Sequence, residues 1–304
     1  MRVEMKIPPP LGRVRGDSVL DDFIVSSLAS IYLATRLFLR ATLGRKRRDR
    51  IFVKHQLDFA TFIYRALKFL GLHNSMLLRL DSPEHGYKYY CRVNRDDLVF
   101  MTGHEDEVMK HFSPSEGNVV VDVGAHIGAY TITSAKQVGE NGRVIAIEAD
   151  PANFKILERN IKLNRLTNVV ALNVAAFSRQ MQLKLYLPEE RAGRTIYNTV
   201  MQSRARDKDQ FVNVQADTLD ALLNSLGFAT ADWFKIDVEG GEYEVLKGAD
   251  SIISKSKDIT LMVEVHGSEM FGPVTNFLDA HSCRIVFEKT NERHDWGHIL
   301  AKKS

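Results

Sequence analysis

Acidic and imidazole side chains stand at the ends of two predicted strands in the second half of the chain. One apolar run ends at Asp237 and Glu239, and another ends at Glu264 and His266. Residues two apart on a strand share a face, so each pair can point the same way. Ligands of open α/β sheets bind beyond the carboxyl ends of the strands. Such a cluster could orient a reacting group, remove a proton from it, or hold a divalent cation.

Each of these residues also has an ordinary structural explanation. His266 on its own is typical of a polar residue whose hydrogen bonds are satisfied at a strand end. Asp237 and Glu239 could cap the turn that precedes the glycine pair at 240–241. In the functional interpretation, a neutral His266 suits a general base near neutral pH. Asp237 could take the same role, or it could hold an acceptor hydroxyl or a cation.

The stretch VVVDVGAHIGAYTIT, residues 119–133, predicts a buried strand, an abrupt turn at Gly124 and a following helix. The turn places backbone N–H groups at a helix N-terminus, where they can meet a polar or anionic ligand. A dinucleotide fingerprint needs glycines where this chain has His126 and Ala129. A nicotinamide or flavin site is therefore disfavoured, although an ordinary strand-to-helix turn would explain this stretch equally well.

The next apolar run ends at Glu148, 24 residues after Gly124, which is about one β-α-β step. A carboxylate at the tip of this second strand can accept the hydroxyls of a ribose. Asp150 and Pro151 then predict a helix start, as N-cap and first-turn residue. Together the two stretches indicate a ribose-containing ligand that needs no pyrophosphate pocket. S-adenosylmethionine (SAM) meets that description.

Four segments resemble the FkbM family of SAM-dependent methyltransferases in their order and spacing. They are VVVDVGAHIGAYTIT, VIAIEADPANFKILERNIKLN, WFKIDVEGGEYEVLKGA and LMVEVHG. The resemblance runs from about Tyr87 to the C-terminus, and the third segment, with Lys235, Asp237, Glu239 and Gly240, is the most specific. It implies an α/β fold: a Rossmann-like class I methyltransferase sheet, mostly parallel with seven strands. The residue pattern adds an N-terminal helical extension, which lies outside the resemblance, and a small β-hairpin.

The resemblance also implies roles for individual residues. The expected catalytic residues are Asp237, His266 and Glu239. A cation is not indicated; if one is bound, the expected ligands are Asp237, Glu264 and His266. The expected cofactor-binding residues are Asp122, Gly124, Ala125, His126, Gly128, Tyr130, Thr131, Glu148, Ala149, Asn153, Asn173, Val174, Ala175, Asp237 and Glu105. Simple packing is the alternative for residues 173–175, and a solvated helix face is the alternative for Glu105.

Composition bounds the function classes. With 304 residues, 26% of them charged, the chain has room for one or two globular domains. Its two cysteines form no metal spacing and favour a reducing cytosol over a disulfide framework. Residues 1–60 carry twelve basic and six acidic side chains, while the rest of the chain carries 29 and 32. The acidic part is not expected to bind nucleic acid.

Two domains are expected: an N-terminal helical extension, 1–85, and the SAM-dependent methyltransferase domain, 86–304. The uncharged run 23–35 is too short to span a membrane. A helical pair packed on the catalytic domain is the favoured interpretation of the extension. The alternative is peripheral membrane contact through residues 19–50, where an apolar helix adjoins a basic cluster. The expected location is cytoplasmic, or peripheral at a membrane under the alternative.

The remaining elements follow the alternation of a parallel α/β sheet. Residues 87–93 and 98–100 predict a small hairpin, and 181–187 with 211–215 predict a second, inserted one. The long connector 188–210 holds four arginines and predicts a substrate lid, with a solvated loop as the alternative. Further strands are predicted at 119–123, 144–147, 169–173, 233–238, 259–265, 283–288 and 296–301.

These features favour a SAM-dependent O-methyltransferase acting on a hydroxyl of a small molecule or a glycan-like substrate. The enzyme would have to align the acceptor and remove its proton. The alternative is an RNA or other N-methyltransferase, although Asp237 is followed by Val238 and Glu239 rather than by the Pro-Pro-aromatic sequence common in such enzymes. A non-catalytic binding module and, more distantly, a dehydrogenase are the other hypotheses. The sequence identifies neither the acceptor nor the oligomeric state.

Overall fold

The computed structural model describes most of the chain from residue 77 onwards. The described residues are 77–82, 87–92, 97, 106–187, 198–204, 210–291 and 296–303. The chain divides into two compact units, one holding residues 1–105 and 190–196, the other holding Asp106–Glu189 and Tyr197–Ser304. The expected N-terminal helices, the segment 19–50, Glu105 and most of the predicted lid lie outside the described residues.

The first unit contains a two-stranded antiparallel sheet. Strand β1 (Leu77–Ser82) pairs with β2 (Tyr87–Arg92), with Ser82 opposite Tyr87. The predicted strand at 87–93 is present as β2, and its pairing with the preceding segment β1 was not predicted. The predicted second strand at 98–100 lies outside the described residues.

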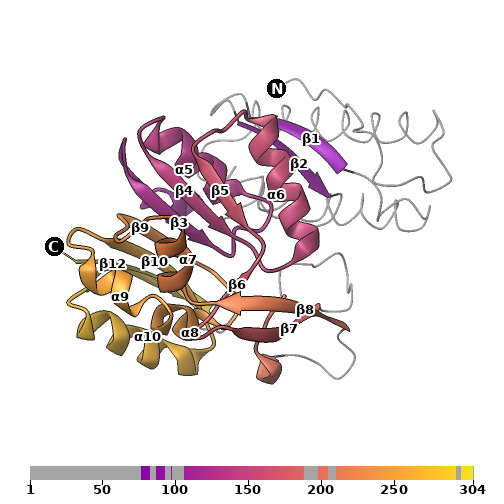
Figure 1. The fold of residues 1–304 in the computed structure, drawn as a ribbon. Helices are drawn as coiled ribbons and strands as arrows, with labels where there is room; N and C mark the ends of the chain where they lie inside the picture. The colour runs from indigo at the N-terminus through magenta and orange to yellow at the C-terminus, as the bar shows by residue number, and fades with distance from the viewer. Residues whose placement is uncertain are drawn as a thin grey trace, which may run out of the picture. The chain divides into compact units, whose positions relative to one another are not determined.

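The second unit is built on a seven-stranded sheet with the order β11-β12-β10-β9-β3-β4-β5 (Figure 1). Its strands are β3 (Val119–Val123), β4 (Arg143–Ile147), β5 (Val169–Leu172), β9 (Trp233–Ile236), β10 (Thr260–His266), β11 (Arg284–Asn291) and β12 (Trp296–Lys302). Neighbours from β5 to β10 are parallel, and β12 is antiparallel to both β10 and β11. This order and this single reversal confirm the Rossmann-like class I methyltransferase sheet.

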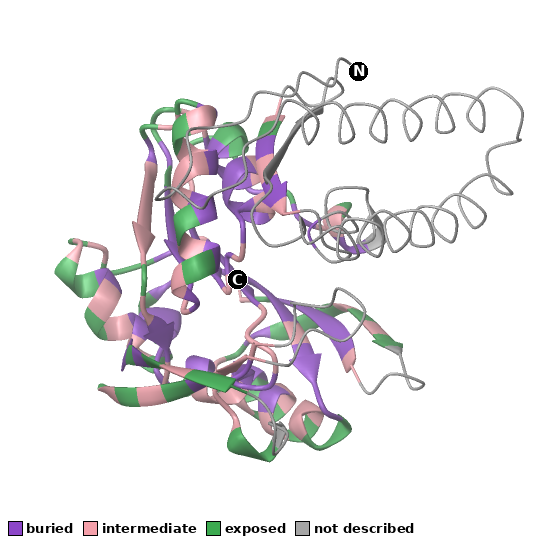
Figure 2. Cartoon of the chain, turned by 90° about the vertical axis from the view of Figure 1, so that its right-hand side faces the viewer, coloured by how far each residue is buried: buried purple, intermediate pink, exposed green. Residues whose placement is uncertain are grey.

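Apolar runs place the central strands in the core. Every residue of β9 is buried, as are the last four residues of β3 and of β4. Strands covered on both faces have continuous apolar sequences, so the sequence of these runs already predicted buried strands. Figure 2 shows buried strands between helices whose outer surfaces are partly exposed.

Helices connect the strands and cover them. They are α4 (Asp106–Met109), α5 (Ala129–Val138), α6 (Pro151–Leu163), α7 (Leu219–Ser225), α8 (Glu242–Lys247), α9 (Asp250–Lys255) and α10 (Ser268–Ala280), with a 3-10 helix at Gln202–Arg204. Helix α5 packs on β3 and β4, α6 on β5, and α8 and α10 on β10 and on each other. Asp150 caps α6 as predicted, accepting the Ala152 N–H at 2.8 Å with Pro151 in the first turn. Helices α9 and α10 were not predicted.

A three-stranded sheet with the order β6-β8-β7 is attached to the main domain. The predicted inserted hairpin is confirmed as β7 (Met181–Leu187) antiparallel to β8 (Gln210–Asp217). Strand β6 (Ala175–Ala176) joins it in parallel and was not predicted, because two alanines carry no strand signal. In the part of the chain that the structure describes, no helix combines the length and apolarity that a membrane span requires.

Candidate active site

Parallel pairing brings four strand ends to one edge of the sheet. Strands β4, β3, β9 and β10 are consecutive neighbours that all run the same way. Their carboxyl ends lead to Glu148, Gly124, Asp237 and His266, respectively. The topology therefore assembles the glycine turn, the second-strand carboxylate and the predicted catalytic residues along one edge.

The turn after β3 is packed directly against the end of β9. Gly124 has a φ of +78°, and a Cβ placed on it would lie 1.8 Å from the backbone oxygen of Asp237. The N–H groups of Gly124 and Ala125 donate to the Ile147 oxygen at 2.9 and 3.0 Å. Gly128 then begins α5 with a φ of +97° and no side-chain cap. Glycine is required at Gly124 because both its dihedral and its close contact exclude a side chain.

Glu148 is buried and tied to the glycine turn. Its Oε2 accepts the His126 N–H at 2.7 Å, and its Oε1 accepts the Asp150 N–H at 2.8 Å and the Asn153 Nδ2 at 3.4 Å. A carboxylate has about four acceptor positions, so one is left for a ligand hydroxyl without rearrangement. Burial raises the pKa of Glu148 to about 7, although its hydrogen bonds from Asp150 and His126 favour the charged form.

Asp122 lies beneath the turn, inside the sheet. Its Oδ2 accepts the Thr131 hydroxyl at 2.5 Å, whereas its Oδ1 is a buried atom with no hydrogen-bond partner in the described structure. Burial raises the pKa of Asp122, an effect that Lys235 and the Thr131 hydroxyl oppose. Next to it, the Lys235 ammonium lies 4.8 Å from the centre of the Tyr130 ring. Asp122, Tyr130 and Thr131 thus form a buried polar layer behind the turn.

The residues after β5 hold the neighbouring strand end in place. Asn173 donates from Nδ2 to the backbone oxygens of Glu148 and Ala149 at 2.8 and 3.2 Å. Val174 and Ala175 instead pack into apolar clusters. Asn173 therefore has a structural function at this edge, while the other two positions fit simple packing as well as a ligand wall.

Asp237 forms an ion pair with Lys235. The Lys235 Nζ lies 2.9 Å from Asp237 Oδ2, and the lysine side chain is only 5% exposed. Burial on its own would raise the pKa of Asp237, but Lys235 first, and then His266 and His298, lower it below the ordinary value. Asp237 is consequently a fixed negative charge at neutral pH and a weak base.

His266 is the centre of a carboxylate cluster. Its Nδ1 lies 2.8 Å from Glu242 Oε1, and its Nε2 lies 3.4 Å from Glu239 Oε2 and 3.6 Å from Glu264 Oε1. Glu264 also contacts His298, with Oε2 and Nε2 3.3 Å apart. The structure thus joins His266 to both Glu239 and Glu264, as their positions at neighbouring strand ends predicted.

The protonation of this cluster differs from the neutral imidazole expected above. Burial alone would lower the pKa of His266, but the carboxylates of Glu239, Glu242 and Asp237 outweigh it and raise the pKa to about 10. Burial also raises the pKa of Glu239 well above its ordinary value, and the neighbouring carboxylates add to the effect against the opposing charge of His266. The carboxylates thus favour the imidazolium form of His266, while burial favours the protonated form of Glu239.

Glu239 has an unusual backbone conformation. Its φ is +56°, in the left-handed region that residues other than glycine rarely adopt. The Thr199 hydroxyl donates to the backbone oxygen of Glu239 at 2.8 Å. The Glu242 carboxylate accepts the N–H of the next residue, Gly240, at 2.9 Å. Such conformations cost about 1–3 kcal/mol and concentrate at functional sites. The surrounding hydrogen bonds hold the carboxylate of Glu239 toward His266.

Three residues of the cluster are spaced as metal ligands could be. Asp237, Glu239 and His266 each offer one ligand atom, and these atoms lie within 4.8 Å of one another. The spacing is compatible with a divalent cation. This set of possible ligands contains Glu239 in place of Glu264, which was expected from the sequence together with Asp237 and His266.

Sequence reasoning missed Glu242. This residue starts α8, has no exposed surface, and contacts both His266 and the turn at Gly240. An acidic residue in a first helical turn is ordinary, because it complements the helix dipole. Its pairing with a histidine 24 residues later is a tertiary contact without a sequence signal.

The sheet order, the glycine turn and the polar strand ends define the class of protein: a class I methyltransferase fold with its ligand edge at the carboxyl ends of β3, β4, β9 and β10. Residues 122–293 match the model of the methyltransferase FkbM domain. The chain belongs to this family, as the four segments in the sequence implied.

Similar proteins include methyltransferases and a tRNA-modifying enzyme. Methyltransferase sdnD of Sordaria araneosa is 28% identical over 158 residues, which span 43% of this chain and 60% of that protein. The tRNA(Phe) (4-demethylwyosine(37)-C(7)) aminocarboxypropyltransferase of Methanocaldococcus jannaschii is 40% identical over 100 residues, 32% of this chain and 39% of that protein. The chain thus aligns with less than two thirds of either relative.

Solved structures with a similar fold include M. jannaschii TYW2 in complex with AdoMet. It has a TM-score of 0.44 and 18% identity and covers 74% of this chain and 85% of its own. A SAM-dependent methyltransferase from Aquifex aeolicus has a TM-score of 0.39 and 16% identity, covering 66% and 89%.

Proposed function

We propose that this protein is a SAM-dependent O-methyltransferase that acts on a hydroxyl of a small molecule or a glycan-like substrate. The observation that carries the proposal is the contact between the glycine turn and the end of β9. Gly124 touches the Asp237 backbone, so a ligand on the turn would lie beside Asp237, Glu239 and His266. Cofactor-type and acid–base groups therefore share one edge.

The residues of the turn fit SAM. Residues 124–128, GAHIG, contain no lysine or arginine to bind a phosphate, while the uncapped start of α5 offers backbone donors. Glu148 would accept a hydrogen bond from a ribose hydroxyl. The region around Asp122, whose Oδ1 has no partner among the described residues, would lie toward the amino-acid end of SAM. When bound, SAM supplies an electrophilic methyl group on a sulfonium.

The acidic cluster supplies what an unactivated hydroxyl needs. Glu239 would accept the proton of the acceptor hydroxyl, because its elevated pKa makes its ionised form a stronger base than an ordinary carboxylate. His266, as an imidazolium, would hold the Glu239 carboxylate in place through Nε2. Asp237, kept ionised by Lys235, would stabilise positive charge beside the acceptor.

Glu148 provides a pH-dependent test of the ribose assignment. Hydroxyl donors favour its ionised form, so binding should lower its pKa, and SAM affinity should fall as pH drops below about 7. We expect the dissociation constant at about pH 6 to exceed that at about pH 8 by up to about tenfold, measured by isothermal titration.

The matched control is Glu148→Gln, which keeps one acceptor oxygen but cannot ionise. It should bind SAM about ten- to a hundredfold more weakly than wild type at about pH 8. Its affinity should vary with pH only as much as the ligand's own groups require. Equal pH dependence in the two proteins would contradict the assignment of Glu148 to the ribose.

Asp237→Asn should separate turnover from cofactor binding. The substitution keeps the volume but removes the charge that faces Lys235, and we expect turnover to fall about 10²-fold. SAM affinity should change much less, because the turn contacts the backbone of Asp237 rather than its carboxylate. Turnover would be measured per folded molecule, since Lys235 loses its ion-pair partner; wild-type turnover would exclude a catalytic role for Asp237.

The acceptor can be identified by methyl transfer from tritium-labelled SAM into host extracts separated into lipid, glycan, small-molecule and RNA pools. Label in a small-molecule or glycan pool would support the proposal. Label confined to RNA would favour the N-methyltransferase alternative, and absence of transfer by folded, SAM-binding protein would favour a binding module.

A further inference from the structure

Glu242 is a buried carboxylate for which the chemistry above has no use. It is the first residue of α8 and has no exposed surface. Its Oε1 lies 2.8 Å from His266 Nδ1 and accepts the Gly240 N–H at 2.9 Å. One oxygen atom thus contacts both the imidazole at the end of β10 and the turn that carries Glu239.

The contact at Nδ1 determines what the other ring nitrogen does. A histidine whose Nδ1 is bonded to a carboxylate is held in one rotation and keeps its proton on that nitrogen. In this structure, Nε2 of His266 then faces Glu239 Oε2 at 3.4 Å and Glu264 Oε1 at 3.6 Å. Rotation of the ring away from Glu242 would break this alignment with Glu239.

A purely structural cap would not need a charge here. The Gly240 N–H could be satisfied by a neutral oxygen, as serine and asparagine do at many helix starts. Burying a carboxylate is costly unless its charge is used, and Oε2 of Glu242 is a buried atom with no hydrogen-bond partner in the described residues. Among the described residues, the charge of Glu242 therefore serves the cationic group that it contacts, His266.

We propose that Glu242 is a positioning residue that holds His266 with Nε2 directed at Glu239 and that fixes the Glu239–Gly240 turn. The proposal rests on the proposed methyl transfer for its effect on turnover. Its effect on the imidazole is independent of any reaction.

The charged groups around His266 define the expected titration. Glu242 approaches from α8, Asp237 and Glu239 from the end of β9, and Glu264 from β10 itself. Beyond them, Lys235 contacts Asp237 and His298 on β12 contacts Glu264. Removing the Glu242 charge leaves the other carboxylates in place, so the pKa of His266 should fall but stay above that of an isolated histidine.

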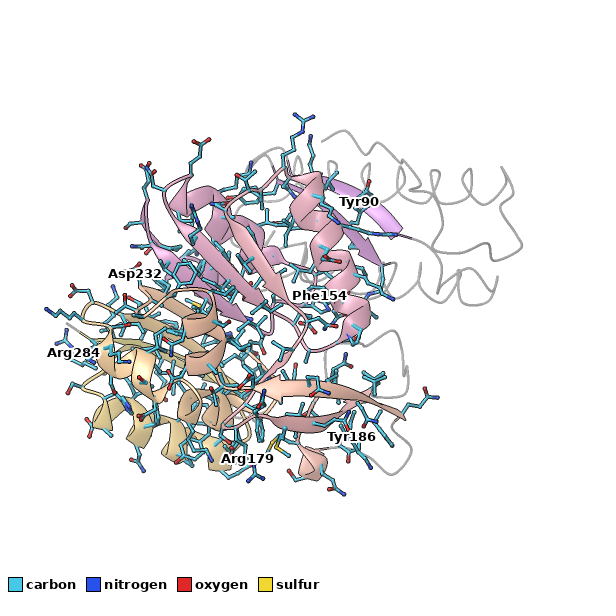
Figure 3. All side chains as sticks on the ribbon, viewed as in Figure 1. Tyr90, Phe154, Arg179, Tyr186, Asp232 and Arg284 are labelled. Atoms are coloured by element: carbon cyan, nitrogen blue, oxygen red, sulfur yellow. The ribbon has the colours of Figure 1, made fainter. Side chains whose placement is uncertain are left out.

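The test combines NMR of the imidazole nitrogens with kinetics, using wild type, Glu242→Gln and Asp232→Asn. Asp232, labelled in Figure 3, accepts the Val119 N–H at 2.7 Å just before β9 and so offers the same carboxylate-to-amide change at the other end of the strand. Glu242→Gln should lower the pKa of His266 by about one unit or more. It should reduce turnover about ten- to a hundredfold, with SAM affinity within about twofold.

The turnover–pH profile gives a second readout. If imidazolium is the active form of His266, the loss of activity at high pH should move to lower pH in Glu242→Gln and stay in place in Asp232→Asn. A folded Glu242→Gln protein with the wild-type pKa of His266 and wild-type turnover would overturn the proposal.

Wild-type protein alone also decides the issue if Glu242→Gln does not fold. In the wild-type protein, Nδ1 of His266 must carry a proton that is hydrogen-bonded to Glu242. If the neutral imidazole of His266 instead keeps its proton on Nε2, the proposal is overturned. The imidazole nitrogen shifts of His266 could depend on Glu242 while the folded wild-type protein transfers no methyl group. That result would support the pairing of Glu242 with His266 and overturn the proposed function instead.

Discussion

Glu239→Gln is expected to lower methyl transfer by about 10²–10⁴-fold, the usual contribution of a general base. Glutamine keeps the side-chain volume and the left-handed backbone, but its amide cannot accept the acceptor's proton. SAM affinity should change by less than about threefold, because no contact of Glu239 reaches the turn after β3 in the described structure. Single-turnover transfer and isothermal titration on the same preparation measure the two quantities.

Two comparisons keep this result interpretable. Glu239→Gly would remove the carboxylate and also relieve the strain of the φ of +56°. It should therefore be as inactive as Glu239→Gln yet no less stable. Activity lost in ethylenediaminetetraacetate and restored by manganese would instead make Asp237, Glu239 and His266 metal ligands, and the assignment of Glu239 as the base would be wrong.

Gly124→Ala should disable both halves of the site. Its Cβ would lie 1.8 Å from the Asp237 oxygen, so the backbone of one turn must move, and the φ of +78° adds its own cost. We expect the free energy of unfolding to fall by about 2–5 kcal/mol from overpacking and left-handed strain. SAM affinity and turnover should both fall more than about tenfold, because Asp237 follows the displaced turn.

The matched control is Gly227→Ala. Gly227 has a similar φ of +84°, but a Cβ there meets nothing within 4 Å. It should lose only about 1–2 kcal/mol and retain SAM binding. Urea unfolding of both variants separates the clash from the dihedral strain. If the free energy of unfolding fell equally in Gly124→Ala and Gly227→Ala, the close contact between Gly124 and Asp237 would add nothing to the cost of the substitution.

The sequence predicted those parts of the fold whose signals are local. The buried run of β3 and the cap of α6 by Asp150 follow from neighbouring residues, and each strand of the β7–β8 hairpin carries its own alternating pattern; all are present. The pairing of β2 with β1 was not predicted, because pairing depends on contacts that a run of apolar residues does not specify.

The candidate site divides along the same line. Asp237, Glu239 and His266 were legible because they end strands, and strand ends are ordered along the chain. Glu242 was not, because its meaning depends on His266 across α8 and β10. The protonation of His266 could not be predicted either, since it is set by Asp237 and Glu239 after β9 together with Glu242 on α8. Sequence patterns indicate which edge is polar, but not which charges oppose each other there.

The short segment at Asn198 and Thr199 has a consequence for cooperativity. Asn198 donates to Asp150 Oδ2 at 2.8 Å, beside Glu148, while Thr199 donates to the Glu239 oxygen at 2.8 Å. Adjacent residues thus connect the end of the edge that holds Glu148 to the end that holds Glu239. A molecule that binds at one end of the edge and stabilises Asn198 and Thr199 should, by reciprocity, bind more tightly when the other end is already occupied. Each hydrogen bond is worth about 0.5–1.5 kcal/mol, so acceptor and cofactor affinities would influence each other by about two- to twelvefold.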